Sequence, residues 1–191
     1  MLKQFLQVIR LAWMGVLFFC VQTHAAIHHP VLKKVPEKSF DVQPLVNSSN
    51  FQEIMTFFEK KYGIPGKLLA AIARVESGKS PWAVNAKGRS YHFRTKEKAL
   101  QFIRALKEKG VKNINVGYMQ INLQSHGRKF KNLEDVLAPY HNIECAAKLI
   151  KHLYKRYGSW ADAIRFYHSG SSYYNVPYQQ KVFHAWAQLC R

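Results

Sequence analysis

The chain has 191 residues, of which 48% are hydrophobic and 14% aromatic, enough for one packed domain and too apolar for a disordered protein. Its 29 Lys and Arg against 11 Asp and Glu give a formal net charge of +18, which favours a polyanionic partner such as nucleic acid, an anionic membrane or an acidic cell-wall polymer. The basic residues form no nucleic-acid-binding motif, so we favour the wall polymer. A basic surface that only aids solubility is the alternative.

Residues 1–25 have the features of a secretory signal peptide. Lys3 and Arg10 give a positive start, residues 11–21 form an uncharged apolar run, and small residues ending at Ala25 offer a cleavage site. The run is short for a bilayer, so we predict cleavage and no stable membrane span afterwards, with an uncleaved anchor as the alternative. The expected location is the periplasm, or the medium if the protein is secreted.

Residues 26–48 contain three prolines and no persistent period, which predicts a flexible linker. Residues 49–191 are then dominated by helical periodicity, so the predicted class is mostly α with one small β-hairpin at 82–93. Helices are expected at 50–63, 64–78, 95–110, 143–158 and 159–170, and from Pro177 onward. The polar segment 113–122 is either a sugar-binding wall or, as this segment alone favours, a glycine-containing turn that leads into buried residues.

Glu76 is the first candidate functional residue. It lies near the end of its expected helix and on the same face as Leu69 and Ile72. A buried carboxylate is costly unless it is protonated or paired, and the last turn of a helix also disfavours the ionised form. Both effects suit a general acid that works near neutral pH. The alternative is a glutamate that bends out to solvent.

Several other chemistries have no support in the sequence. It contains no HExxH, paired CxxC, phosphate-binding glycine loop or GxSxG motif, so we expect no metal and no cofactor. Ordinary glycosidases use two carboxylates, but the other acids, such as Glu59 and Glu108, are expected on solvated helix faces. Together with the many tyrosines, which suit sugar binding, this suggests glycan cleavage by a single carboxylate.

Cys145 and Cys190 are the two cysteines that remain after removal of the signal peptide. An even pair in an oxidising compartment favours a disulfide, which would join the last helix to the helix that contains Cys145. Two separately buried thiols are the alternative.

Four motifs, in order and spacing, resemble those of the lytic transglycosylase (SLT) family, over roughly residues 49–187. They are Glu76-Ser77, Gly117-Tyr118-Met119-Gln120-Ile121-Asn122, Asn142-Ile143 with Ala146-Ala147, and Phe166-Tyr167-His168-Ser169-Gly170. The resemblance implies a lysozyme-like fold and a peptidoglycan substrate. The insert before Gly117 is similar to that of the subgroup associated with type IV secretion, conjugation and pilus assembly. Two positions depart from the pattern: His168 stands where the family often has Asn, and Asn115 where the subgroup often has Asp.

The resemblance also implies a mechanism. Protonated Glu76 would donate to the glycosidic oxygen between N-acetylmuramic acid and N-acetylglucosamine, with help from the sugar's N-acetyl group at the anomeric carbon. As a carboxylate it would then deprotonate the muramyl 6-hydroxyl, which closes a 1,6-anhydro ring. The implied substrate-binding residues are Ser77, Tyr118, Met119, Gln120, Asn122, Tyr167 and Tyr178.

The expected partners are peptidoglycan glycan strands and components of a secretion, conjugation or pilus machine, with no nucleic acid, and the protein is expected to be a monomer. Two other functions stay open at this point. A hydrolytic, lysozyme-type muramidase would need a second carboxylate or an ordered-water site within about 10 Å of Glu76. A non-catalytic peptidoglycan-binding assembly protein would need only the basic surface and a sugar groove.

Overall fold

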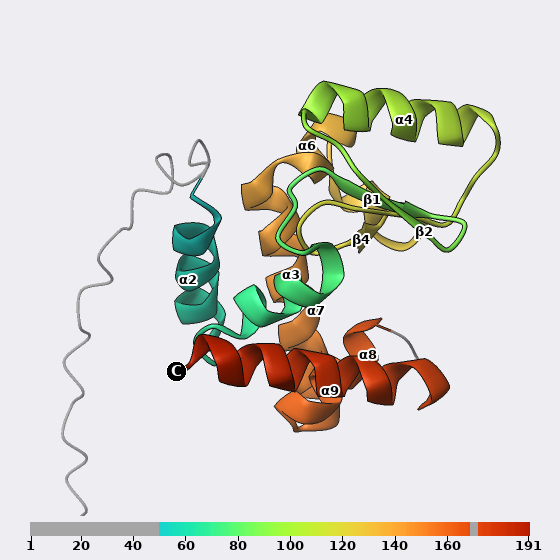
Figure 1. Ribbon diagram of the computed structural model, residues 1–191. Helices are drawn as coiled ribbons and strands as arrows, with labels where there is room; N and C mark the ends of the chain where they lie inside the picture. The colour runs from blue at the N-terminus through green and yellow to red at the C-terminus, as the bar shows by residue number, and fades with distance from the viewer. Residues whose placement is uncertain (1–49, 169–171) are drawn as a thin grey trace, which may run out of the picture. The chain divides into compact units, whose positions relative to one another are not determined.

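The computed structural model describes residues 50–168 and 172–191, which Figure 1 shows as a group of helices beside one small sheet. The predicted signal peptide (1–25) and linker (26–48) lie outside the described residues, as do two residues of the last motif, Ser169 and Gly170. The mostly α class predicted from the sequence is confirmed. Within the described stretches, no helix has both the length and the apolar character needed to cross a membrane.

The helices account for most of the described chain. They are α2 (Phe51–Tyr62), α3 (Leu68–Ser77), α4 (Lys96–Glu108), α5 (Leu123–His126), α6 (Leu133–Leu137), α7 (Pro139–Tyr157), α8 (Trp160–His168) and α9 (Ser172–Leu189), with a 3-10 turn at Gly127–Lys129. The sequence did not predict α5, α6 or the 3-10 turn, because elements this short carry too little of a hydrophobic period to be recognised.

Caps that are visible in the sequence set several helix ends. Asn50 Oδ1 accepts a hydrogen bond from Gln52 N at the start of α2, at 3.2 Å, and Thr95 Oγ1 accepts one from Lys98 N at the start of α4, at 3.3 Å. Gly63 ends α2 in the left-handed conformation, at φ 58°, which a residue without a side chain adopts at little cost. Local sequence is therefore enough to place these ends.

The core surrounds α3 and α7. Helix α7 packs against α2 and α8 through a face that includes Ile143, Ala146 and Ile150, each fully buried. Helix α3 is buried throughout Leu68–Ala73, and it packs against α2 and α9. A helix that is apolar all round must be enclosed by its neighbours, and this enclosure fixes the helix that carries Glu76 in its last turn.

The sheet is larger than the sequence predicted. The expected hairpin is confirmed as β1 (Ala83–Ala86) paired with β2 (Arg89–His92). Two further strands, β3 (Ile114–Val116) and β4 (Ile121–Asn122), extend it to the antiparallel order β2-β1-β3-β4. The segment interpreted as a turn or a wall therefore forms two strands joined by a buried turn, and α4 packs against β1 (Figure 1).

The last helix begins earlier than predicted. The sequence indicates a start at Pro177, but α9 starts at Ser172 and Pro177 lies inside it. A proline inside a helix removes one backbone hydrogen bond, and here tertiary contacts hold the first turns in spite of that loss. Arg165 Nε donates to Asn175 Oδ1 at 3.0 Å, and both Asn175 and Tyr178 are buried.

Glu59 is not the solvated residue that the sequence suggested. It is only 4% exposed, and its two carboxylate oxygens accept hydrogen bonds from Lys67 N and Leu69 N, both at 2.9 Å. No side chain of α3 itself caps that helix, so Glu59 of α2 does so from outside. Burial raises the pKa of the Glu59 carboxyl, and the two backbone hydrogen bonds oppose part of this rise.

We predict that Glu59→Ala lowers the free energy of unfolding by about 2 kcal/mol or more, because it leaves two N–H groups at the start of α3 without an acceptor. Urea denaturation followed by circular dichroism measures this. The matched control is Glu108→Ala, at an exposed position of α4, which should change the free energy of unfolding by less than about 0.5 kcal/mol. Equal stabilities of the two variants would contradict the capping role.

Candidate active site

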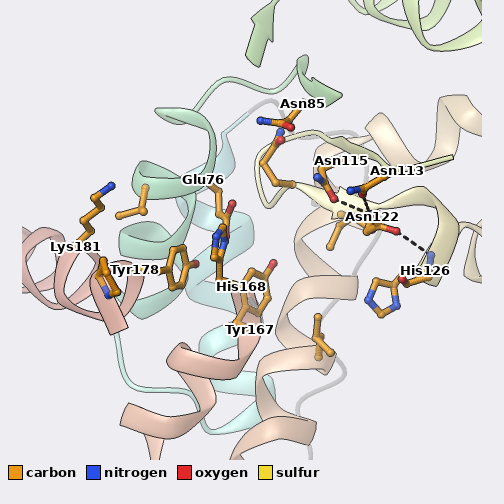
Figure 2. A pocket seen from close by; sticks show the side chains of 16 residues that line it. Glu76, Asn85, Asn113, Asn115, Asn122, His126, Tyr167, His168, Tyr178 and Lys181 are labelled. Carbon is orange, nitrogen blue, oxygen red and sulfur yellow. Dashed lines mark hydrogen bonds and ion pairs between the residues drawn. The ribbon is translucent and has the colours of Figure 1, made fainter. Parts of the chain in front are cut away.

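A cleft of about 910 Å³ lies between the helices and the sheet. Figure 2 shows its two walls, with Glu76, His168 and Tyr178 on the helical side and the asparagines on the sheet side. The helical wall consists of Val75, Glu76, Leu149, Tyr167, His168, Pro177, Tyr178 and Lys181. The sheet wall consists of Asn85, Asn113, Asn115, Gln120, Ile121 and Asn122, with Ser125 and His126 of α5.

Glu76 stands in the last turn of α3, and its side chain is only 11% exposed. The interpretation in which this glutamate bends out to solvent is therefore wrong. Among the described residues that line the cleft, Glu76 is the only acid. A largely buried carboxyl group that faces a cleft can pass a proton to a ligand bound there, which fits the role of a general acid.

His168 and Tyr178 lie beside the Glu76 carboxylate. His168 Nδ1 is 3.9 Å from Glu76 Oε1, so a protonated imidazole would form an ion pair with the acid. The His168 ring stacks on the ring of Tyr178 with centroids 4.5 Å apart and an interplanar angle of 10°. This stacking fixes the orientation of the imidazole toward Glu76.

Two tyrosine hydroxyls near Glu76 are held in the protonated form. Burial raises the pKa of Tyr178 well above its usual range, and the charges of Glu76 and Tyr167 add to the rise. Burial likewise raises the pKa of Tyr167, again with a contribution from Glu76. Among the described residues the buried Tyr178 hydroxyl has no hydrogen-bond partner within ordinary distance, and a longer contact with the Glu76 carboxylate adds to the rise in its pKa.

The turn between β3 and β4 is held by three helices. Ser77 Oγ of α3 donates to the Tyr118 carbonyl at 2.8 Å, and Tyr167 Oη of α8 donates to the Met119 carbonyl at 2.8 Å. Asn142 Oδ1 of α7 accepts from Met119 N at 2.9 Å. The position of the next residue, Gln120, in the sheet wall therefore depends on all three helices.

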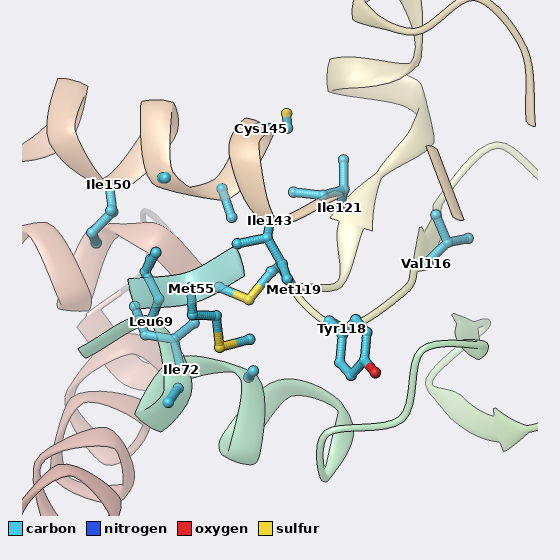
Figure 3. Packing of buried hydrophobic residues seen from close by; sticks show 14 of the residues in the cluster. Met55, Leu69, Ile72, Val116, Tyr118, Met119, Ile121, Ile143, Cys145 and Ile150 are labelled. Atoms are coloured by element: carbon cyan, nitrogen blue, oxygen red, sulfur yellow. The ribbon is translucent and has the colours of Figure 1, made fainter. Parts of the chain in front are cut away.

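Three residues that were predicted to bind substrate are not in the wall. Ser77, Tyr118 and Met119 are 3%, 6% and 0% exposed, and none of them lines the cleft. Figure 3 shows Met119 among buried side chains that include Ile143. A side chain enclosed in this way cannot contact a sugar, so these three residues support the site from behind.

The other predicted binding residues are brought together in the cleft. Tyr167 and Tyr178 stand in the helical wall, and Gln120 and Asn122 stand in the sheet wall. Gln120 has φ 47°, and its Nε2 donates to the Gly117 carbonyl at 3.0 Å. This bond spans the turn and fixes the side chain at the edge of the cleft.

Sequence reasoning missed the role of Asn142. Its amide is fully buried, and Nδ2 donates to the carbonyls of Val116 and Val136 at 3.0 and 2.9 Å. An asparagine within the apolar stripe of a helix is a usable signal, because a buried amide must find partners. It also missed Asn85, His126 and Lys181, which join the cleft only through the strand register and the docking of α5 and α9. Asn113 and Asn115 belong to the segment 113–122, for which a sugar-binding wall was the interpretation that the segment alone did not favour.

The predicted disulfide is not formed. Both cysteines are free thiols, Cys145 buried on α7 and Cys190 exposed after α9. Cys145 belongs to the same buried cluster as Ile121 (Figure 3), whereas a hydrogen bond from Trp186 Nε1 to Gly66 O, at 2.9 Å, holds the end of α9 at the start of α3. An even number of cysteines does not bring two such distant positions together.

The comparisons with known proteins give one match. A family model described as "Transglycosylase SLT domain" matches residues 53–182, which include both walls of the cleft and every motif quoted above. A search of curated proteins and a search of solved structures each returned no match. In the described part of the chain, no group of three or more His, Cys, Asp or Glu is placed to hold a metal ion.

We predict that Gly117→Ala strongly destabilises the fold. Gly117 has φ 81°, and a Cβ there would overlap the side-chain amide of Asn142, with Cγ only 2.7 Å away. The matched control is Gly88→Ala, at φ 73° with open space around it, which should cost about 1 kcal/mol for the left-handed conformation alone.

Gly117→Ala should lower the free energy of unfolding by at least about 2 kcal/mol more than this control does, because overpacking against Asn142 is added to the backbone strain. Thermal and urea denaturation of both variants measure the difference. If the two alanine variants were equally stable, the close approach of Asn142 would not be what requires glycine at this position.

Proposed function

Because the chain belongs to the transglycosylase SLT domain family, a family of peptidoglycan-cleaving enzymes with a lysozyme-like fold, we propose that it cleaves glycan strands by a lytic, non-hydrolytic route that leaves 1,6-anhydromuramyl ends. The bond cleaved is the β-1,4 bond between N-acetylmuramic acid and N-acetylglucosamine. Glu76 serves as the single catalytic residue of this proposal.

The observation that carries this proposal is the absence of a second acid among the described residues that line the cleft. The wall that faces Glu76 presents asparagine amides instead, including Asn115. A hydrolytic, lysozyme-type enzyme needs a second carboxylate or an ordered-water site. An amide cannot act as nucleophile or general base, which favours a nucleophile supplied by the substrate.

The proposed reaction begins with Glu76 in its protonated form. Its proton moves to the glycosidic oxygen as the bond from that oxygen to the muramyl anomeric carbon breaks, and the neighbouring N-acetyl oxygen stabilises the electron-poor carbon. The Glu76 carboxylate then takes the proton of the muramyl 6-hydroxyl while that oxygen bonds to the anomeric carbon. Glu76 ends protonated, water is not consumed, and proton and bond changes balance.

The two tyrosines have a role in this cycle that follows from their protonation state. A hydroxyl that stays neutral can donate a hydrogen bond to the Glu76 carboxylate formed after the first proton transfer. The Tyr178 hydroxyl is placed for this because it is buried beside Glu76. Tyr167 already donates a hydrogen bond to the Met119 carbonyl, which helps to fix the position of the sheet wall relative to Glu76.

We also propose that the protein is exported and acts in the periplasm, on the basis of the signal-like residues 1–25 and the net charge of +18, which suits an anionic wall. A role in opening the wall for a secretion, conjugation or pilus machine is supported by the insert that forms the β1–β2 hairpin and α4. This insert, which precedes the turn at Gly117, resembles that of the subgroup with such roles.

We predict that Glu76→Gln lowers peptidoglycan cleavage by at least about 100-fold while leaving glycan binding intact, because an amide of nearly the same shape cannot donate the proton. Muropeptide masses after digestion of purified sacculi measure both the rate and the product. Anhydro ends support the lytic route. The control is Glu134→Gln on α6, which lies outside the cleft and should leave turnover unchanged.

Other results would decide between the remaining functions. Reducing ends from the unmodified protein would identify a hydrolytic muramidase. Intact sacculi that retain bound protein would identify a non-catalytic wall-binding protein. Substantial turnover by Glu76→Gln would remove Glu76 from the catalytic role.

A further inference from the structure

The sheet wall of the cleft carries a row of amides that run across three strands. The strand register places Asn85 of β1 opposite Asn115 of β3, and Asn115 opposite Asn122 of β4. Their neighbours along the strands, such as Val84 and Val116, are buried on the other face. Because side chains alternate between the two faces of a strand, the asparagines share the face that lines the cleft.

A helix cap fixes the direction of the hydrogen bonds in this row. Asn122 caps α5, and its Oδ1 accepts from Ser125 N at 2.9 Å. A backbone N–H can only donate, so the oxygen of Asn122 must face α5 and its nitrogen must face the row. Asn122 Nδ2 in turn donates to Asn113 Oδ1 at 2.7 Å and to Asn115 Oδ1 at 2.9 Å.

The oxygens of Asn113 and Asn115 therefore each accept a hydrogen bond from Asn122, and this orients their NH2 groups away from Asn122. No hydrogen bond from either nitrogen is made to any residue in the described part of the chain. Figure 2 shows Asn113 and Asn115 beside Asn122, on the wall across from Glu76. Asn85 differs, because it bonds to the Ser90 hydroxyl, which can donate or accept, so its direction is not fixed.

We infer that Asn113 and Asn115 form a donor pair that binds the carbonyl oxygens of acetamido groups on the glycan. The pair offers two NH2 groups without a partner among the described residues, whereas each oxygen already accepts one hydrogen bond. It therefore favours a ligand that presents a carbonyl oxygen over one that presents an ammonium group at the same place. This inference rests on the proposed function for its substrate, and it makes N-acetylation of the sugar a condition for tight binding.

Asn115→Asp tests the inference with little structural change. An aspartate oxygen still accepts from Asn122, so the row is preserved while the free donor is replaced by a carboxylate. The matched control is Asn85→Asp, which adds the same charge to the same wall without removing a fixed donor. Thermal denaturation of both variants checks that the fold is kept.

Binding is measured by calorimetry in the Glu76→Gln background, with tetra-N-acetylchitotetraose and its fully de-N-acetylated form as probes. We expect the acetylated probe to bind about tenfold more weakly to the Asn115→Asp protein, roughly the loss of one or two hydrogen bonds, and the cationic probe to bind more tightly. The Asn85→Asp control should keep the preference for the acetylated probe. Unchanged affinities in Asn115→Asp would overturn the inference, as would an equal change in the control.

This result is independent of the test of cleavage. If sacculi are cut to anhydro products but Asn115→Asp binds both probes normally, the donor pair is wrong and the proposed function stands. If the preference for the acetylated probe depends on Asn115 but no cleavage of sacculi occurs, the donor pair stands and the proposed function is wrong.

Discussion

The amide of Asn142 is the contact on which the rest of the site depends. It is fully buried, and it ties α7 to the strand β3 and to the turn that follows, through Val116 and Met119. A buried amide with any of these bonds missing would be costly, so the turn has one stable position. Gly117 lies so close to this amide that no side chain fits there. The carbonyls of the turn are then in place for α3 and α8 to bind.

The site therefore consists of a support and a wall with different chemistry. The support is buried and fully hydrogen-bonded, and it includes Ser77, Met119 and Asn142. Among its described residues the wall that faces the cleft has one acid, Glu76, and the hydroxyls of Tyr167 and Tyr178 near it are held in the neutral form. A rigid support of this kind holds catalytic and binding groups at fixed separations, which is a larger contribution to catalysis than any one surface contact.

Local signals in the sequence predicted the helices and the acid, and long-range contacts explain what it did not predict. Caps such as Asn50 and the period that places Glu76 on an apolar face depend on neighbours within one or two turns. The cap that Glu59 provides for α3 and the register that aligns the asparagines depend on tertiary packing. The same limit explains the errors at Ser77 and Met119, because a motif does not say which of its side chains face inward.

The position of α9 makes the cleft depend on contacts between residues that are far apart in the sequence. This helix supplies Tyr178 to the cleft, and its far end binds the start of α3, where Lys67 Nζ donates to the Leu189 carbonyl at 2.7 Å. The two partners are 122 residues apart, and contacts over such separations form late because they close a long loop. A chain without α9 lacks one side of the cleft and the restraint on the helix that carries Glu76. The cleft in this form therefore exists only after α9 has docked.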